Sequence, residues 1–230
     1  MTKRIAKENQ IIDAAEKVFS SQGFVNAKME DVAKAAGISK GSVYFYFSSK
    51  ENLYMTITYR AFQLLIDTYY SNVEKTQHDT GLASTLNIME VFMRFCENHF
   101  LYSEAMLIYI SMVRSSSEGA DISKMTEAIQ DSIYYKKVQD LQHIPVSIVI
   151  KEIERGKLDG SIKNTQRPEI IYLTAWAMVI GYIKLNTSSG KKKPSILKTE
   201  ISEWRSSILT WAKMMLINES EGARERECGS

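Results

Sequence analysis

Residues 33–50, AKAAGISKGSVYFYFSSK, contain two short helical patterns that meet at a single glycine, Gly37. The small side chains of Ala33 and Ala36 lie on the inner face of the first pattern. Ser39 is placed to cap the second pattern, because its hydroxyl can accept the backbone N–H groups of the next turn. Small residues where two helices touch and a glycine at the corner between them indicate a helix-turn-helix.

The second of these helices has two different faces. Val43 and Phe47 are four residues apart and form an apolar face, whereas Lys40, Ser42 and Tyr44 lie on the opposite side. The helix is short and basic at its N-terminal end, which is the end that enters the major groove of DNA in helix-turn-helix proteins. We therefore expect the segment to contact DNA.

Composition agrees with a folded helical protein that has a mildly basic N-terminal part. Pro (3) and Gly (11) are scarce among the 230 residues, which favours helices over sheets. Residues 1–50 carry eight Lys/Arg and five Asp/Glu, a net +3, and residues 51–230 carry 21 and 22, a net −1. This charge fits a local nucleic-acid contact, although an ordinary solvated surface fits it almost as well.

We expect the protein to be cytoplasmic and to have no membrane partner. The N-terminus MTKRIAKENQ lacks the apolar stretch of a signal peptide. The most apolar segment, residues 170–183, has the length of a buried helix and is too short to span a bilayer. The two cysteines, Cys96 and Cys228, imply no disulfide framework.

Helical periodicity extends over nearly the whole chain, and neither a strand pattern nor an internal repeat is present, so the fold class is all-α. We expect a three-helix helix-turn-helix domain in residues 1–50, a larger helical effector-binding and dimerisation domain in 51–218, and a charged, disordered tail in 219–230. Pro145 should split a long helical region. The second helix should begin near Ala27 with Asn26 as its cap. The expected helices cover residues 6–22, 27–36, 40–47, 50–75, 82–100, 104–113, a region up to 155, 169–185 and 195–217, with a loop at 115–121.

Residues 11–53 resemble the TetR/AcrR family of bacterial transcriptional repressors. The resemblance rests on three co-registered groups of residues: Phe19, Gly23 and Phe24; then Val32, Ala33, Ala36, Gly37, Ile38 and Ser39; then Tyr44, Phe47, Lys50 and Leu53. Two positions depart from the family's usual pattern. Ala27 and Lys28 stand where a capping threonine is common, and Tyr46 stands where histidine is common.

The resemblance, together with residue chemistry, assigns the DNA contacts. Phosphate contacts position a protein on DNA, and contacts to base edges specify sequence. We expect phosphate contacts from Lys28, Tyr44, Tyr46 and Lys50, and base contacts from Lys40, Gly41 and Ser42, with Ser39 as the cap of the recognition helix. The alternative for Tyr44 and Tyr46 is that they only pack against other helices.

A homodimer on a palindromic operator is the expected assembly. One short helix reads few base pairs, so sufficient affinity usually requires two copies on one duplex. The resemblance implies that the last two helices join the copies, and their apolar stripes agree with this, although the same stripes could face the chain's own core. The expected interface residues are Leu173, Trp176, Ala177, Ile180, Gly181, Ile201, Trp204, Ile208, Trp211 and Met215.

The middle helices are rich in aromatic residues and methionine, which suits an adaptable pocket for a small lipophilic effector. The alternative is that these side chains are ordinary core. The helix at 50–75 would connect the pocket to the DNA-binding domain and shift it between two states. The expected lining residues are Phe62, Tyr69, Phe92, Phe95, Cys96, Phe100, Met106, Tyr109 and Met112.

Two other functions fit less well. A constitutive DNA-binding protein without an effector would leave the aromatic interior of the larger domain unused. A helical enzyme could use Cys96 and His99, three residues apart on one predicted helix, as metal ligands or as a nucleophile and base. We found no phosphate-binding glycine loop and no cluster of metal ligands in the sequence, so we expect no enzyme, no metal site and no cofactor.

Overall fold

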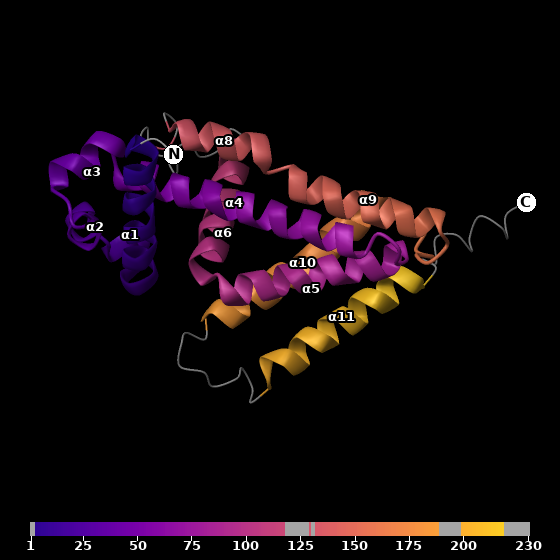
Figure 1. Cartoon of the computed structure of the whole chain (residues 1–230). Helices are drawn as coiled ribbons and strands as arrows, with labels where there is room; N and C mark the ends of the chain where they lie inside the picture. The colour runs from indigo at the N-terminus through magenta and orange to yellow at the C-terminus, as the bar shows by residue number, and fades with distance from the viewer. Residues whose placement is uncertain (1–2, 118–128, 130–131, 189–198, 219–230) are drawn as a thin grey trace, which may run out of the picture. The chain divides into compact units, whose positions relative to one another are not determined.

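The computed structural model describes residues 3–117, 129, 132–188 and 199–218, and the regular secondary structure within these ranges is helical (Figure 1). This confirms the all-α fold class. The tail at 219–230, including Cys228, lies outside the described residues, as do the start of the last predicted helix at Ser195 and residues 118–121 of the predicted loop.

The helix-turn-helix is formed by α1 (Lys3–Asn26), α2 (Met29–Ala36) and α3 (Lys40–Tyr46). Gly23 breaks the regular helical conformation of α1 with φ 75° and ψ 160°, at the residue where the sequence predicts a stop. Gly37 adopts a left-handed conformation, φ 65° and ψ 35°, and forms the corner between α2 and α3.

The predicted start of α2 is wrong by two residues. The amide of Asn26 donates to the carbonyl of Gln22 and does not cap α2. Lys28 is the residue that precedes the helix, and its backbone N–H donates to the carboxylate of Asp31 at 3.3 Å. Asp31 thus supplies one half of a capping box from inside the first turn.

The other helices follow the predicted order. Pro145 lies in the first turn of α9, so the long helical region divides there as expected. The predicted loop at 115–121 begins too early, because α6 continues to Ser117. The bounds are α4 (Lys50–Lys75), α5 (Gly81–Asn98), α6 (Phe100–Ser117), α8 (Ile133–Leu141), α9 (Ile144–Leu158), α10 (Pro168–Ser188) and α11 (Ile201–Ile217).

The chain divides into two compact units, one of Met1–Leu64 with His99–Gln142 and one of Leu65–Asn98 with His143–Ser230. Residues of α4 belong to both units. These units do not coincide with the domain boundary at residue 50, which remains a prediction.

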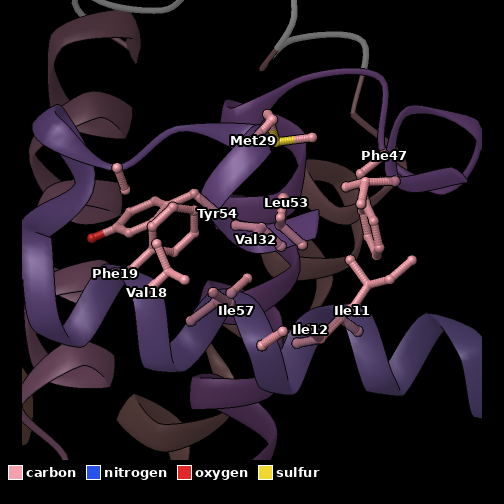
Figure 2. Close-up of a cluster of buried hydrophobic side chains, with 14 of the residues drawn as sticks. Ile11, Ile12, Val18, Phe19, Met29, Val32, Phe47, Leu53, Tyr54 and Ile57 are labelled. Carbon is pink, nitrogen blue, oxygen red and sulfur yellow. The ribbon is translucent and has the colours of Figure 1, made fainter. Parts of the chain in front are cut away.

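The core of the first unit contains more than the three N-terminal helices. Phe19, Val32 and Phe47 are buried there. Leu53 of α4 and Leu101 of α6 are buried in the same cluster (Figure 2 shows its labelled members). The DNA-binding helices are therefore supported by side chains from α4 and α6 as well as by one another.

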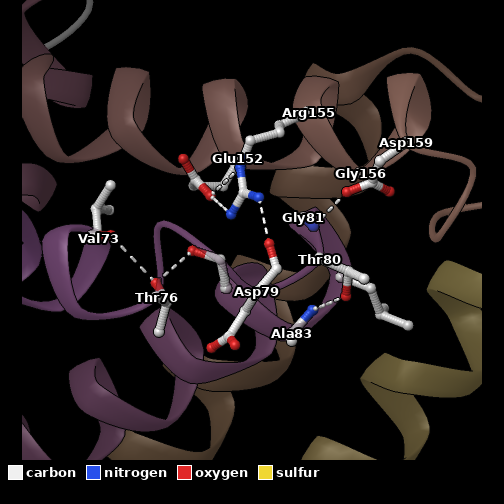
Figure 3. A network of polar contacts seen from close by, with 12 residues as sticks. Val73, Thr76, Asp79, Thr80, Gly81, Ala83, Glu152, Arg155, Gly156 and Asp159 are labelled. Atoms are coloured by element: carbon white, nitrogen blue, oxygen red, sulfur yellow. Dashed lines mark hydrogen bonds and ion pairs between the residues drawn. The ribbon is translucent and has the colours of Figure 1, made fainter.

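The second unit is built from the C-terminal part of α4 together with α5, α9, α10 and α11. One close contact sets the distance between α5 and α9. A Cβ atom on Gly81 would lie 2.0 Å from the backbone nitrogen of Gly156, so neither helix leaves room for a side chain there. The carboxylate of Asp159 accepts the backbone N–H of Gly81 at 2.7 Å, and Arg155 donates to the carbonyl of Asp79 at 2.5 Å (Figure 3). The loop after α9 thereby caps the N-terminus of α5.

Candidate nucleic-acid interface

The N-terminus of α3 is organised by Ser39. Its hydroxyl accepts the backbone N–H of Ser42 at 3.1 Å, and the two serine hydroxyl oxygens lie 2.8 Å apart. This confirms the predicted cap. The side chain of Ser42 is therefore held beside the first turn of the recognition helix.

Lys40 is exposed and forms an ion pair with Glu30 of α2. Its ammonium also lies 5.7 Å from the centroid of the Tyr44 ring. The hydrogen bond with Glu30 raises the pKa of Lys40, and the same bond lowers the pKa of the Glu30 carboxyl. Lys40 is thus charged at neutral pH, but its charge is compensated by Glu30.

Three further predicted contacts are accessible, namely Gly41 and Tyr44 on α3 and Lys28 before α2. The Tyr44 side chain is 42% exposed, and Lys28 is also exposed. A Cβ atom on Gly41 would have its nearest neighbour, the Ser39 hydroxyl, 4.0 Å away. A duplex could therefore approach the backbone at Gly41 closely.

Sequence reasoning missed Phe45, which is 78% exposed on α3. It lies two residues from both Val43 and Phe47, so at 100° per residue it points away from the buried face of the helix. That periodicity could have identified it. Tyr46, by contrast, is half-buried and packs against the core of the first unit, with its ring 5.3 Å from that of Phe45.

The structure gives Lys50 a different use from the predicted phosphate contact. Its ammonium donates to the carbonyls of Phe24, Val25 and Ala27, at 2.8, 3.1 and 3.1 Å, and lies 4.6 Å from the Phe24 ring centroid. An ammonium group has three donors, and these bonds use all of them. Lys50 therefore closes the connection between α1 and α2.

Comparison with known proteins agrees with this geometry. The family model described as "Bacterial regulatory proteins, tetR family" matches residues 11–56, which contain α2 and α3 and the start of α4. This chain belongs to the TetR family of bacterial transcriptional regulators.

Two relatives of this TetR-family chain extend the similarity beyond the DNA-binding helices. It is 29% identical over 198 residues to the uncharacterized HTH-type transcriptional regulator YhgD of Bacillus subtilis, covering 86% of this chain and 92% of that protein. It is 24% identical over 169 residues to IcaR of Staphylococcus aureus, named as the negative transcriptional regulator of the biofilm operon icaADBC, covering 74% and 81%.

A solved structure supports the fold of the TetR-family chain as a whole. The regulator FadR of Bacillus subtilis, in complex with stearoyl-CoA, matches with a TM-score of 0.63 and 15% identity over 90% of this chain and 97% of that one. At this identity the match shows that the fold is shared.

The second unit of this TetR-family regulator contains a cavity of about 50 Å³. Among the predicted pocket residues whose side chains are described, Tyr69 and Phe92 line this cavity and the others do not. Phe62 and Tyr109 form an edge-to-face pair in the first unit, Phe95, Cys96 and Met106 are buried elsewhere, and Phe100 is 47% exposed. Met112 lies outside the residues whose side chains are described.

The predicted interface residues on α10 and α11 differ in how far they are buried within the chain. Ile208 is buried, and Trp204 packs against Tyr182 with ring centroids 4.8 Å apart, so both contribute to the chain's own core. Trp176 lines the cavity. Ile180, Ile201 and Met215 are half-buried, while Leu173, Ala177, Gly181 and Trp211 are exposed.

An enzymatic pair of Cys96 and His99 is not supported by the helix on which it was predicted. The helix α5 ends at Asn98, so His99 lies beyond it, where its ring stacks on Tyr102. The two side chains therefore do not share one face of a continuous helix. Within the described residues, no group of three or more His, Cys, Asp or Glu is placed to hold a metal ion.

Proposed function

We propose that this TetR-family regulator binds a palindromic operator in double-stranded DNA as a homodimer, represses transcription there, and is released by a small apolar effector. The observation that carries the proposal is the outer surface of α3, where a capped helix exposes Lys40, Gly41 and Tyr44. Repression is supported by the relative IcaR, which is named as a negative regulator. The protein would act in the cytoplasm, where its DNA is.

The DNA contacts are assigned by chemistry and exposure. Lys40 can donate to guanine, Ser42 can bond to several base edges, and Gly41 allows a close approach. Phe45 adds an exposed ring that can contact the methyl group of thymine. Lys28 and Tyr44 are proposed to bind phosphate. Tyr46 is a weaker candidate because it is half-buried, and Lys50 is left out because its donors are used.

The proposed dimer uses the exposed side of α10 together with part of α11. The apolar segment 170–183, expected to be too short for a bilayer, lies within the helical stretch Pro168–Leu185, which by length and composition alone is long and apolar enough to cross a membrane. The expectation about its length is therefore wrong. Only 22% of the stretch is buried within the chain. Its exposed residues Leu173, Ala177 and Gly181 follow helical spacing. An uncovered apolar face on such a helix supports its burial against a second copy.

Effector release is proposed to act through α4. This helix contributes Leu53 to the core of the first unit and Tyr69 to the lining of the cavity in the second. A ligand that binds one conformation of α4 better than another shifts the population toward that conformation. A constitutive regulator is the second candidate, because the cavity is small, at about 50 Å³.

The test begins with selection of bound duplexes from a random pool, followed by gel-shift titration of the selected operator. Lys40→Ala and Tyr44→Ala should abolish specific binding and leave helical content, measured by circular dichroism, unchanged. Lys151→Ala, an exposed lysine of the second unit, is the matched control and should bind normally. Unchanged operator affinity in both α3 variants would refute the proposal.

A further inference from the structure

The cavity in the second unit is lined by side chains from α4, α5, α9, α10 and α11, and none of the lining residues in the described part of the chain is charged. Elsewhere in the same unit, Glu97 and Arg205 form an ion pair that is satisfied by its own contacts, at 2.6 and 2.7 Å, and by the hydroxyl of Tyr182. A charged group in this cavity would lose its hydration without gaining a partner of opposite charge, which is strongly unfavourable.

One polar group in the lining lacks a partner. Thr85 of α5 is 7% exposed, and its hydroxyl makes no hydrogen bond within the described structure. Buried hydroxyls in proteins are usually paired, and an unpaired one lowers stability. The Thr85 hydroxyl is therefore available to form a hydrogen bond with a ligand.

Other threonines of the chain show how unusual this is. Five of them donate their hydroxyl to the carbonyl four residues earlier, namely Thr56, Thr58, Thr76, Thr174 and Thr210. The same local bond would join Thr85 to the carbonyl of Gly81, but it does not form. The preceding residue, Ser84, pairs its hydroxyl with that of Thr76 at 3.0 Å.

From these observations we infer that the cavity binds an uncharged ligand with a slender apolar body and one hydrogen-bonding group, which pairs with the hydroxyl of Thr85. The inference rests on the proposed function, since it names the class of effector. The volume of about 50 Å³ is well below the roughly 150 Å³ of an engineered cavity that binds benzene, so a narrow chain fits better than a ring. Met89 lines the cavity, and its flexible side chain can move to widen it.

The other hydroxyls in the lining keep the cavity neutral. Burial raises the pKa of Tyr172 to about 12, and burial, with smaller contributions from Tyr172 and Cys96, raises that of Tyr69 well above its ordinary value. Both phenols are therefore protonated at any physiological pH. They can offer a hydrogen bond to a neutral ligand and no charge to an ionic one.

The test compares three ligands with the same eight-carbon chain: 1-octanol, octylammonium and octanoate. Binding is followed by the emission of Trp176, which lines the cavity, with Trp176→Phe as the blank that assigns the signal. We expect 1-octanol to bind at least about tenfold more tightly than either ion. Thr85→Val should weaken 1-octanol binding about three- to tenfold, the loss of one hydrogen bond. Thr56→Val, outside the cavity, is the matched control and should leave it unchanged.

The ligand-free variant gives a second readout. Thr85→Val removes an unpaired buried hydroxyl, so its melting temperature should equal or exceed that of the wild type. If Thr85 had a purely structural role, the substitution would lower the melting temperature. Any of three results would overturn the inference. Octylammonium or octanoate binds at least as tightly as 1-octanol, Thr85→Val leaves the affinity for 1-octanol unchanged, or the emission of Trp176 does not respond to 1-octanol.

The same titrations on the operator complex separate this inference from the proposed function. If octylammonium or octanoate releases DNA and 1-octanol does not, effector release stands and the assigned ligand class is wrong. If 1-octanol binds in a Thr85-dependent way while the operator complex survives saturation, the ligand class stands and effector release is wrong.

Discussion

In the proposed complex with DNA, Lys40 must exchange partners. In the free protein its ammonium is held by Glu30, and both side chains are solvent-exposed. A guanine edge would replace the carboxylate, and the unpaired Glu30 would then lie near the negative charge of the duplex. Glu30 therefore opposes binding in two ways, by holding Lys40 and by repelling phosphate.

Glu30→Gln should increase operator affinity several-fold at low salt, because it releases Lys40 and removes one repelling charge. Fluorescence anisotropy titrations at a series of salt concentrations would measure this. Glu154→Gln, an exposed glutamate of the second unit, serves as the control and should have no effect. Weaker binding by Glu30→Gln would mean that the pair itself positions Lys40 for its base.

Phe45 offers a direct test of sequence reading. Phe45→Ala should weaken binding to the selected operator about three- to tenfold, as expected for loss of one apolar contact with a thymine methyl. Replacing each operator thymine by uracil in turn should identify a position where the wild type loses the same factor and Phe45→Ala loses nothing more. Additive losses at every position would show that the ring does not touch a methyl group.

Between α5 and α9 of the second unit, the two backbones lie too close together for a side chain at Gly81. Gly81 faces backbone atoms of Gly156, which cannot move independently of their helix. Gly156 faces the side chain of Ile162 as well, and that side chain can adjust. The two glycines should therefore differ in their tolerance of a methyl group.

Gly81→Ala should lower the free energy of unfolding by about 3 kcal/mol or more, and Gly156→Ala by about 1–3 kcal/mol. Gly41→Ala is the control, because its Cβ would have no neighbour closer than 4.0 Å, and it should be neutral or stabilising by up to about 1 kcal/mol. Urea unfolding followed by circular dichroism gives these values. Equal stability of Gly81→Ala and the wild type would disprove the contact.

Features that depend on neighbouring residues could be predicted from the sequence. The corner at Gly37, the Ser39 cap and the stop at Gly23 each follow from one residue type in one local pattern. Features that depend on distant residues could not. The partners of Lys50 lie 23–26 residues away, and no local pattern shows that a lysine will bond to those carbonyls.

Most of the residues that line the cavity could likewise not be predicted from local sequence patterns. Its lining combines α4 and α5 with α9, α10 and α11, and an aromatic stripe does not reveal which helix it will face. The sequence predicts Tyr69 and Phe92 as lining residues. It carries no signal for Thr85, the lining residue whose hydroxyl is unpaired. The sequence predicts Trp176 at the dimer interface, and the structure places it in the lining of the cavity.

In the whole molecule, binding of a palindromic operator as proposed requires two copies of the chain. Leu173 is 47% exposed on α10, so Leu173→Glu should leave the fold of one chain intact and place a charge in the proposed interface. We expect it to sediment as a monomer at micromolar concentration and to lose at least about a hundredfold in operator affinity. Leu158→Glu, at a residue 89% exposed on α9, is the control and should remain dimeric. A dimeric Leu173→Glu would place the interface elsewhere.

The most direct measurement compares binding of the wild type to the selected palindrome and to a duplex carrying one half-site, each against random competitor at low ionic strength. We expect two chains on the palindrome and an affinity at least about a hundredfold higher than for the half-site, because two copies of α3 then act together. Equal affinity for palindrome, half-site and random duplex would contradict this expectation.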